Sequence, residues 1–225
     1  NFNSRMVSMA PQQRNLPLFP LNTVLFPNAT LPLQIFEDRY KEMLRDCLDS
    51  DSRFGIVLIK EGQEVGDPST PYNVGTVAHI LQVSEIRNGA RFFVSTQGGR
   101  RFSINNITQR RPYIIADVEL WDRESEDELV GKELEEVKEA LTKYRSLVTG
   151  LEGGWMGELR LTSDAVSLSY QIAAILQIRM HERQALLEEP HASDRLQSEL
   201  KYLQRDLEAL TREVSRKMRR KFSNQ

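Results

Sequence analysis

The chain has 225 residues, enough for one large domain or two small ones with a buried core. Its 30 basic and 32 acidic residues leave a net charge of −2, so the overall charge gives no reason to expect a nucleic-acid or membrane partner. The apolar runs are too short to span a bilayer. The one cysteine, Cys47, excludes an internal disulfide framework and favours a cytoplasmic location.

The composition changes near residue 118, where frequent proline gives way to a stretch that contains only Pro190. Short β-branched and aromatic runs before this point predict strands. The later stretch is rich in Leu, Glu, Lys and Arg, which favour helices. We therefore expect a flexible leader at 1–14, a β domain at 15–121 and an α-helical domain at 122–225.

The first half predicts short strands at 15–19, 23–26, 31–35, 54–59, 74–86, 91–96, 101–105 and 113–121. Pro32 lacks a backbone N–H, so the strand that contains it is expected at a sheet edge or to end early. Asn88-Gly89 predicts a hairpin turn, because both residues tolerate positive φ. Strands joined in this way favour a small, mostly antiparallel, barrel-like sheet. His79 is expected to be buried within it.

One helix is predicted among these strands, because apolar residues recur there at helical spacing: Tyr40, Met43, Leu44, Cys47 and Leu48. Cys47 belongs to this apolar stripe, and no histidine lies near it in the sequence. Since a reactive thiol needs an activating base, Cys47 is predicted to be a buried core residue and not a nucleophile.

The second half predicts three helices. The first covers 134–148 and follows an acidic segment, 124–128, that is expected to face solvent. The second runs through 172–187, with Ser163 or Asp164 as its N-cap. The third, 194–221, carries an apolar seam with alternating spacings of four and three: Leu196, Leu200, Leu203, Leu207, Leu210 and Val214. This seam fits a helix in an antiparallel bundle and also a coiled-coil dimer, so monomer and dimer both remain open.

The motifs of common enzymes are absent from the sequence. It has no phosphate-binding loop, no dinucleotide-binding glycine pattern and no nucleophile elbow. The three histidines stand far apart, and no pair has metal-ligand spacing. The sequence therefore predicts no catalytic residue, no metal site and no cofactor.

Two features are candidates for binding. Six arginines fall in or beside the predicted hairpin strands: Arg87, Arg91, Arg100, Arg101, Arg110 and Arg111. With Phe92, Phe93 and Phe102 among them, they fit a face for single-stranded nucleic acid, although strand alternation favours inward phenylalanines and solvated arginines. The second feature is a glycine-rich loop holding Trp155 and Met156, which either presents an apolar tip to a peptide or folds back on the core.

Three ordered motifs carry a resemblance to a known family: Leu16-Pro-Leu-Phe-Pro20, Val24-Leu-Phe-Pro27 and the run from Leu31 to Tyr40. They resemble the N-terminal substrate-binding domain of Lon proteases, especially the stand-alone bacterial versions. Further similarity lies at 54–57, 74–78, 99–102, 168–173 and 184–188. The resemblance implies an α+β fold: a PUA-like, mostly antiparallel β pseudo-barrel with one inserted helix, followed by a C-terminal helical bundle with a long last helix.

The resemblance also implies recognition without catalysis. This chain ends where the ATPase of full-length Lon would begin, and it lacks the Walker loop and the serine–lysine dyad. We expect a non-enzymatic module that binds unfolded or partly unfolded polypeptides, as an adaptor or quality-control factor with a separate protease as one candidate partner. The expected site is an apolar surface between the two domains or the Trp155–Met156 loop. RNA binding through the six arginines is the alternative, and it predicts steep loss of affinity with salt.

Overall fold

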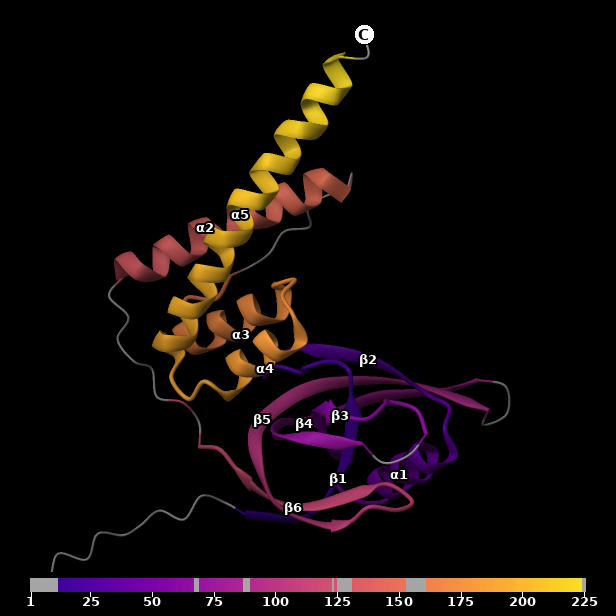
Figure 1. The fold of residues 1–225 in the computed structure, drawn as a ribbon. Helices are drawn as coiled ribbons and strands as arrows, with labels where there is room; N and C mark the ends of the chain where they lie inside the picture. Colours follow the sequence, from indigo (N-terminus) through magenta and orange to yellow (C-terminus); the bar gives the residue numbers. More distant parts are fainter. Residues whose placement is uncertain are drawn as a thin grey trace, which may run out of the picture. The chain divides into compact units, whose positions relative to one another are not determined.

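The computed structural model describes residues 12–66, 69–86, 90–122, 124, 131–152 and 161–223. The chain divides into two compact units, Asn1–Arg123 and Glu124–Gln225. The first contains a six-stranded sheet and one helix, and the second contains helices, so the α+β class is confirmed (Figure 1). We call them the β unit and the helical unit.

The β unit is built from six strands: β1 (Gln12–Leu21), β2 (Thr30–Ile35), β3 (Arg53–Glu61), β4 (Thr70–Ile86), β5 (Arg91–Gln109) and β6 (Ile114–Leu120). The sheet order is β2-β5-β4-β3-β1-β6, and only the β1–β3 pair is parallel among these strands. Because β5 also pairs with β6, the sheet curls back on itself into a barrel-like form. Among these six strands, β2 pairs with β5 alone and lies at an edge, as Pro32 predicts.

The structure corrects three of the predicted strands. Residues 23–26 form no strand, although Val24, Leu25 and Phe26 are buried, because side-chain and loop contacts replace a ladder there. The Thr76 hydroxyl donates to the Leu25 carbonyl at 2.6 Å. The strands expected at 91–96 and 101–105 are one strand, β5, which passes through Gly98 without a turn. A Cβ at Gly98 would lie 2.1 Å from the Phe26 carbonyl oxygen, so this glycine permits a close backbone approach.

The interior of the β unit contains two apolar clusters. One gathers Phe19, Ile35, Tyr40, Phe54 and their neighbours, and the other gathers Leu18, Val57, Phe102 and theirs. His79, which was expected to be buried, is exposed, and a Cβ at Gly99 would lie 2.5 Å from its Nε2. Phe93 is also exposed, contrary to the expectation that all three nearby phenylalanines turn inward.

The inserted helix is α1 (Asp38–Leu48), and the predicted apolar stripe packs on the first cluster. Tyr40, Met43, Leu44 and Cys47 are buried, whereas Leu48, at the last helical residue, is exposed. The prediction of a buried thiol is therefore confirmed. Burial, with Asp51 and Asp46 nearby, raises the pKa of the Cys47 thiol to about 12, so the thiolate is strongly disfavoured.

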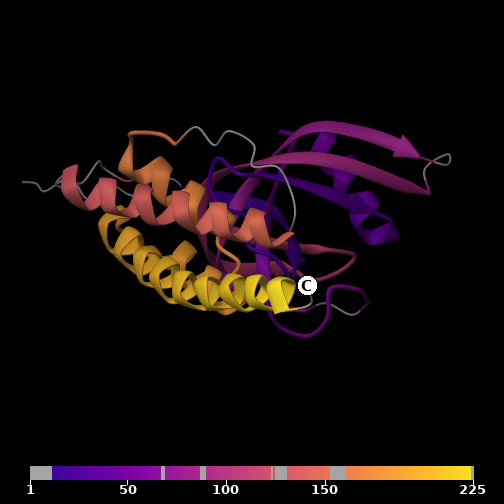
Figure 2. The ribbon, with the colours of Figure 1, turned by 90° about the horizontal axis from the view of Figure 1, so that it is seen from above.

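The helical unit contains α2 (Gly131–Glu152), α3 (Ala165–Ile175), α4 (Met180–Glu188) and α5 (Ala192–Ser223). Helices α2 and α5 pack side by side (Figure 2).

The prediction of one helix through 172–187 is wrong, because two helices, α3 and α4, cover this range. Leu176 is extended at the end of α3, and α4 begins after Arg179. The Arg179 backbone N–H donates to the Glu182 carboxylate at the start of α4. The Asp164 prediction is confirmed, because its carboxylate accepts from Ser167 N at 2.7 Å.

The core-facing stripe of α5 is not wholly apolar. Leu196 and Leu203 of the predicted seam are buried, but so are Arg195 and Glu199. Arg195 forms an ion pair with Glu124 at 2.6 Å, with side chains 0% and 8% exposed. Glu124 was expected to face solvent in an acidic lead-in; its burial against a residue 71 positions away corrects that expectation. Among the described residues, no helix is long and apolar enough to cross a membrane.

Candidate functional site

The β unit has a hollow of about 270 Å³ between the start of the inserted helix and the sheet. Its lining residues come from β1, β2, the start of α1 and the β3–β4 connection: Phe19, Leu21, Pro32, Leu33, Gln34, Ile35, Phe36, Glu37, Tyr40, Glu64 and Val65. We call this hollow the β2 groove. All of its walls belong to the β unit, so its geometry is set within one compact unit.

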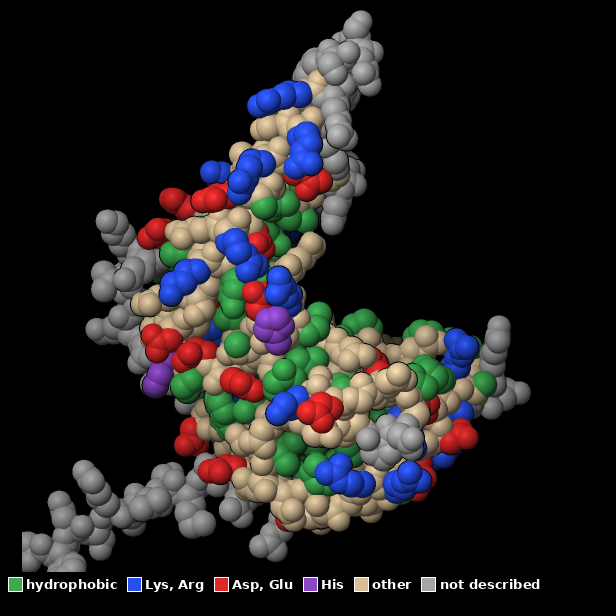
Figure 3. Space-filling view, in the orientation of Figure 1, with side chains coloured by type: hydrophobic (Ala, Val, Ile, Leu, Met, Phe, Trp, Pro, Cys, Tyr) green, Lys and Arg blue, Asp and Glu red, His purple; other side chains and the backbone are tan. Residues whose placement is uncertain are grey.

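The floor of the β2 groove is buried and apolar, and its rim carries large exposed apolar side chains. Phe19 and Tyr40 lie on the floor with ring centroids 4.2 Å apart. At the rim, Phe36 is 48% exposed and Val65 is 54% exposed. Figure 3 shows hydrophobic side chains reaching the surface of the β unit on the face in view. Clusters of exposed apolar residues around a hollow are typical of binding sites.

Two carboxylates and one guanidinium hold one wall of the β2 groove in place. Arg39 lies 3.0 Å from Glu37 in an ion pair and donates to the Glu64 carbonyl at 3.2 Å, which ties the start of α1 to the β3–β4 connection. The guanidinium also lies over the Tyr40 ring, 4.4 Å from its centroid. The Glu64 carboxylate accepts from Asn22 N at 3.1 Å. This wall is therefore anchored on both sides.

The chemistry of the β2 groove suits binding. Its one phenol, Tyr40, has its pKa raised to about 12 by burial, which keeps it neutral. The carboxylates of Glu37 and Glu64 are the charged groups among its lining residues. Among the described residues, no group of three or more His, Cys, Asp or Glu side chains is placed to hold a metal ion. The arrangement can bury apolar side chains and attract a cation.

The two residues predicted for peptide binding, Trp155 and Met156, lie outside the described residues, as does Arg87. The structure does not bring the other five arginines together on one exposed face. Arg101 is buried and lies over the Trp121 ring at 4.3 Å. Arg100 donates to the Trp121 carbonyl at 2.9 Å and lies 3.7 Å from Asp122.

The remaining arginines are exposed but separated along one strand. Arg91 begins β5, and Arg110 and Arg111 follow its last residue. A stacking platform for bases needs aromatic side chains interleaved with free cations on one surface. With Arg101 buried and Arg100 paired, no structural observation favours the RNA-binding alternative.

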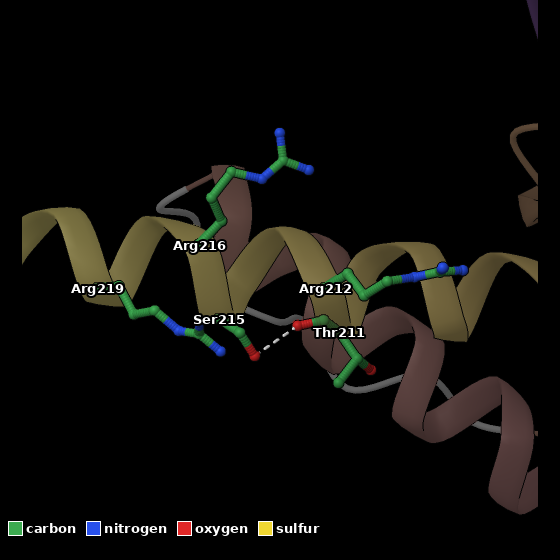
Figure 4. Close-up of a pocket in the computed structure, with 5 residues that line it drawn as sticks. All are labelled: Thr211, Arg212, Ser215, Arg216 and Arg219. Atoms are coloured by element: carbon green, nitrogen blue, oxygen red, sulfur yellow. Dashed lines mark hydrogen bonds between the residues drawn. The ribbon is translucent and has the colours of Figure 1, made fainter.

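Two further hollows lie on the helical unit, each lined by described residues of a single helix. One, of about 550 Å³, lies on α2 and is lined by seven mostly polar residues between Glu135 and Leu147. The other, of about 360 Å³, lies on α5 beside three arginines: Arg212, Arg216 and Arg219. Their side chains point in different directions, and Ser215 Oγ donates to the Thr211 carbonyl of its own helix at 2.9 Å (Figure 4). The polar side chains of these two hollows do not point toward a shared position where a ligand would bind.

Sequence reasoning did not select the residues of the β2 groove, although a signal for them was present. Eight of the eleven lining residues fall in two motifs that carry the family resemblance, 16–20 and 31–40. These motifs are mostly apolar, and apolar runs of this kind are typical of a buried core. The structure shows that one apolar run both builds the core and lines a hollow, since alternate residues of β2 are buried and exposed.

Comparisons with known proteins identify a family. The family model of the ATP-dependent protease La (LON) substrate-binding domain matches residues 15–205. The Lon protease of Buchnera aphidicola subsp. Schizaphis graminum is 23% identical over 98% of this chain and 28% of that protein. The Lon protease of Dictyoglomus thermophilum is 27% identical over 93% of this chain and 26% of that protein. The chain thus spans about a quarter of the length of these relatives.

Solved structures agree in fold. A Lon N-terminal domain protein from Xanthomonas campestris has a TM-score of 0.65 and 28% identity, and the match covers 84% of this chain and 98% of that one. The N-terminal domain of a Mycobacterium avium complex Lon protease has a TM-score of 0.55 and 16% identity, with 85% and 98% covered. The likeness extends over both the barrel-like sheet and most of the helical unit.

Proposed function

The chain belongs to the Lon substrate-binding domain family, and from this premise we propose that it is a non-catalytic receptor for unfolded or partly unfolded polypeptides. The proposed contact surface is the β2 groove. The observation that carries the proposal is a buried apolar floor beneath the half-exposed rim residues Phe36 and Val65. An adaptor or quality-control role in the cytoplasm, beside a separate protease, follows from the same proposal.

The size and lining of the β2 groove suit side chains of many sequences. Covering the exposed parts of Phe36 and Val65 contributes about 2–4 kcal/mol at roughly 25 cal/mol per Å² of apolar surface. Association then opposes this gain through lost translational and side-chain freedom. Apolar burial is also nondirectional, so it discriminates weakly between apolar side chains. The expected result is modest affinity for any exposed apolar segment, which suits surveillance of unfolded chains.

The test uses the full chain and a reduced, carboxymethylated, fluorescein-labelled protein that stays unfolded in buffer. Binding is measured by fluorescence anisotropy. A Phe36→Ser, Val65→Ser double variant is expected to bind about tenfold more weakly, because it removes the apolar rim while changing only exposed side chains. Affinity is expected to change little with salt, whereas phosphate contacts would make it fall steeply.

The matched control is a Leu81→Ser, Ile86→Ser double variant. These two residues are 56% and 42% exposed, and neither lines the β2 groove. The control is expected to bind as the wild type does. Absence of binding by the wild type, or equal loss in both double variants, would contradict the proposed site.

The loop prediction is tested in the same assay. A Trp155→Ala, Met156→Ala double variant measures the contribution of the glycine-rich loop. Loss of binding in this variant with no loss in the rim variant would move the site from the β2 groove to the loop. Loss in both would make them two contact points for one polypeptide.

A further inference from the structure

The β2 groove runs along the unpaired edge of a strand. Among the described residues, strand β2 pairs with β5 and with no other strand, so its second edge carries no ladder there. Four consecutive residues of β2, 32–35, line the groove, and Phe36 follows directly after the strand. Side chains of alternate residues leave opposite faces of a strand, so four in succession can border one hollow only along the strand's edge.

Two hydrogen bonds establish which backbone groups face that free edge. Gly98 N donates to the Ala29 carbonyl at 2.8 Å, and the Thr96 hydroxyl donates to the Leu31 carbonyl at 2.8 Å. The carbonyls of Ala29 and Leu31 therefore point toward β5. Because carbonyl direction alternates along a strand, the Pro32 carbonyl and both backbone groups of Gln34 point to the free edge.

Pro32 limits what this edge can bind. It contributes a carbonyl but no N–H, which is a common protection of edge strands against pairing with other copies. Gln34 keeps both groups, and its side chain is exposed. The edge is therefore suited to a short segment centred on Gln34 and poorly suited to a long ladder.

We propose that the polypeptide binds in extended conformation as a strand added to the free edge of β2, centred on Gln34. This inference rests on the proposed function and specifies its mode. Main-chain hydrogen bonds to Gln34 would supply affinity without regard to sequence, and alternate side chains would enter the β2 groove. Strand addition of this kind gives broad recognition, because every extended segment offers the same backbone groups.

Charge at the β2 groove selects among extended segments. Its lining has two carboxylates, Glu37 and Glu64, and the adjacent Arg39 offsets one of them. The net local charge is therefore about −1, which favours a lysine or arginine in the bound segment. The fitting partner is an extended polypeptide with apolar residues at alternate positions and one basic residue.

The probe is a ten-residue, fluorescein-labelled peptide with valine or phenylalanine at alternate positions, threonine between them and one lysine. Two matched peptides carry N-methyl groups on two backbone amides, one at odd and the other at even positions. N-methylation removes a donor and blocks strand pairing on that side alone. One matched peptide is expected to bind roughly tenfold more weakly and the other within about twofold of the parent.

A pair of protein variants tests the same edge from the other side. Gln34→Pro removes the outward N–H and leaves the ladder to β5 intact, whereas Gln34→Ala changes the side chain and keeps the N–H. Gln34→Pro is expected to weaken peptide binding roughly three- to tenfold, and Gln34→Ala less than twofold. If Gln34→Pro fails to fold, the methylated peptides on wild-type protein still decide the question.

The outcomes separate this inference from the proposed function. Loss of parent-peptide binding in the Phe36→Ser, Val65→Ser variant, with equal binding of both methylated peptides, would overturn strand addition and leave the proposed function standing. No binding of the parent peptide or of the unfolded protein would overturn both. Replacing the peptide lysine by glutamate is expected to weaken binding roughly two- to fivefold, and equal binding would overturn the charge preference.

Discussion

The two units bury polar side chains in different ways. In the β unit, the buried hydroxyls of Thr76 and Thr96 each donate to a backbone carbonyl, at 2.6 and 2.8 Å, and the buried Arg101 guanidinium lies over the Trp121 ring at 4.3 Å. In the helical unit, α5 directs two charged residues, Arg195 and Glu199, into the core, each 0% exposed. Arg195 is fully engaged, but neither carboxylate oxygen of Glu199 has a hydrogen-bond partner among the described residues.

This difference follows from how each architecture satisfies its backbone. A sheet pairs its N–H and C=O groups across strands, so its interior can be almost wholly apolar and its edge strand can border a groove. Helices satisfy their backbone internally and contact each other through side chains alone. Buried charges fixed by defined partners can restrict how such helices pack, at a cost in desolvation. The β unit carries the proposed site, and the helical unit carries the buried ionic contacts.

The sharpest test of this comparison removes the buried guanidinium. Arg195 pairs with Glu124 at 2.6 Å, donates to Ser169 Oγ at 2.9 Å and to the Glu189 carbonyl at 2.8 Å, and covers the Tyr170 ring. Arg195→Met leaves a buried carboxylate without its cation. We expect the helical unit to lose about 3–5 kcal/mol of stability, measured by urea unfolding.

The control for this variant is Arg205→Met on the same helix. Arg205 pairs with Glu182 and Asp206, but its side chain is 52% exposed, so about 0–1 kcal/mol is expected. Hydrogen exchange read by mass spectrometry assigns the loss to a unit. Exchange that accelerates equally in 12–122 and in 161–223 would break the comparison, because the two units would then unfold as one.

The second prediction tests close packing in the β unit. A Cβ at Gly98 would lie 2.1 Å from a backbone oxygen, so Gly98→Ala is expected to cost the β unit about 2–3 kcal/mol. Gly150, exposed in α2, has nothing within 4 Å of the same added atom, and Gly150→Ala is expected to stabilise the helical unit by about 0.5–1 kcal/mol. Opposite shifts in urea midpoint are the expected result. An unchanged urea midpoint in Gly98→Ala would contradict this prediction, because it would show that the Phe26 backbone moves aside at little cost.

Gly98 also illustrates why part of the fold could not be predicted from the sequence. Local rules were sufficient where the cause is local: Asp164 caps α3, Pro32 marks an edge strand, and the stripe around Cys47 packs inward. The sequence predicts separate strands at 91–96 and 101–105, but Gly98 and Gly99 lie between them within one strand and allow close approach to Phe26 and His79. A glycine permits both turns and close contacts, and only the tertiary neighbour decides which applies.

The buried ionic contact and the candidate site could not be predicted from the sequence for a related reason. Glu124 begins an acidic stretch typical of a solvated segment, and nothing near it in sequence indicates Arg195 as its partner. The lining of the β2 groove is drawn from residues 19 to 65, which the sheet and α1 bring together. The family motifs contained most of these residues, but periodicity alone does not separate an apolar side chain that fills a core from one that borders a hollow.

The smallest expected effect concerns Glu199, and it depends on pH. Burial raises the pKa of this carboxyl well above its ordinary value, and the nearby Arg195 opposes the rise without cancelling it. A folded-state pKa above the unfolded one means that the native state holds a proton that the unfolded chain has released. The stability that Glu199 contributes is therefore present below the unfolded pKa and is lost as the pH rises through the folded one.

Glu199→Gln tests this dependence because glutamine mimics the protonated acid. The free energy of unfolding of the variant is expected to equal that of the wild type at about pH 4 and to exceed it by about 1–2 kcal/mol at about pH 8. Its urea unfolding should therefore depend less on pH. Glu213→Gln, at an exposed position of α5, should leave the wild-type dependence unchanged. Loss of stability at high pH in Glu199→Gln would mean that the carboxylate is held ionised in the folded unit. Arg195 would then be the cation for two buried carboxylates, Glu124 and Glu199. Every buried charge that the structure describes on α5 would have a partner, as the buried Thr76 and Thr96 hydroxyls of the β unit do.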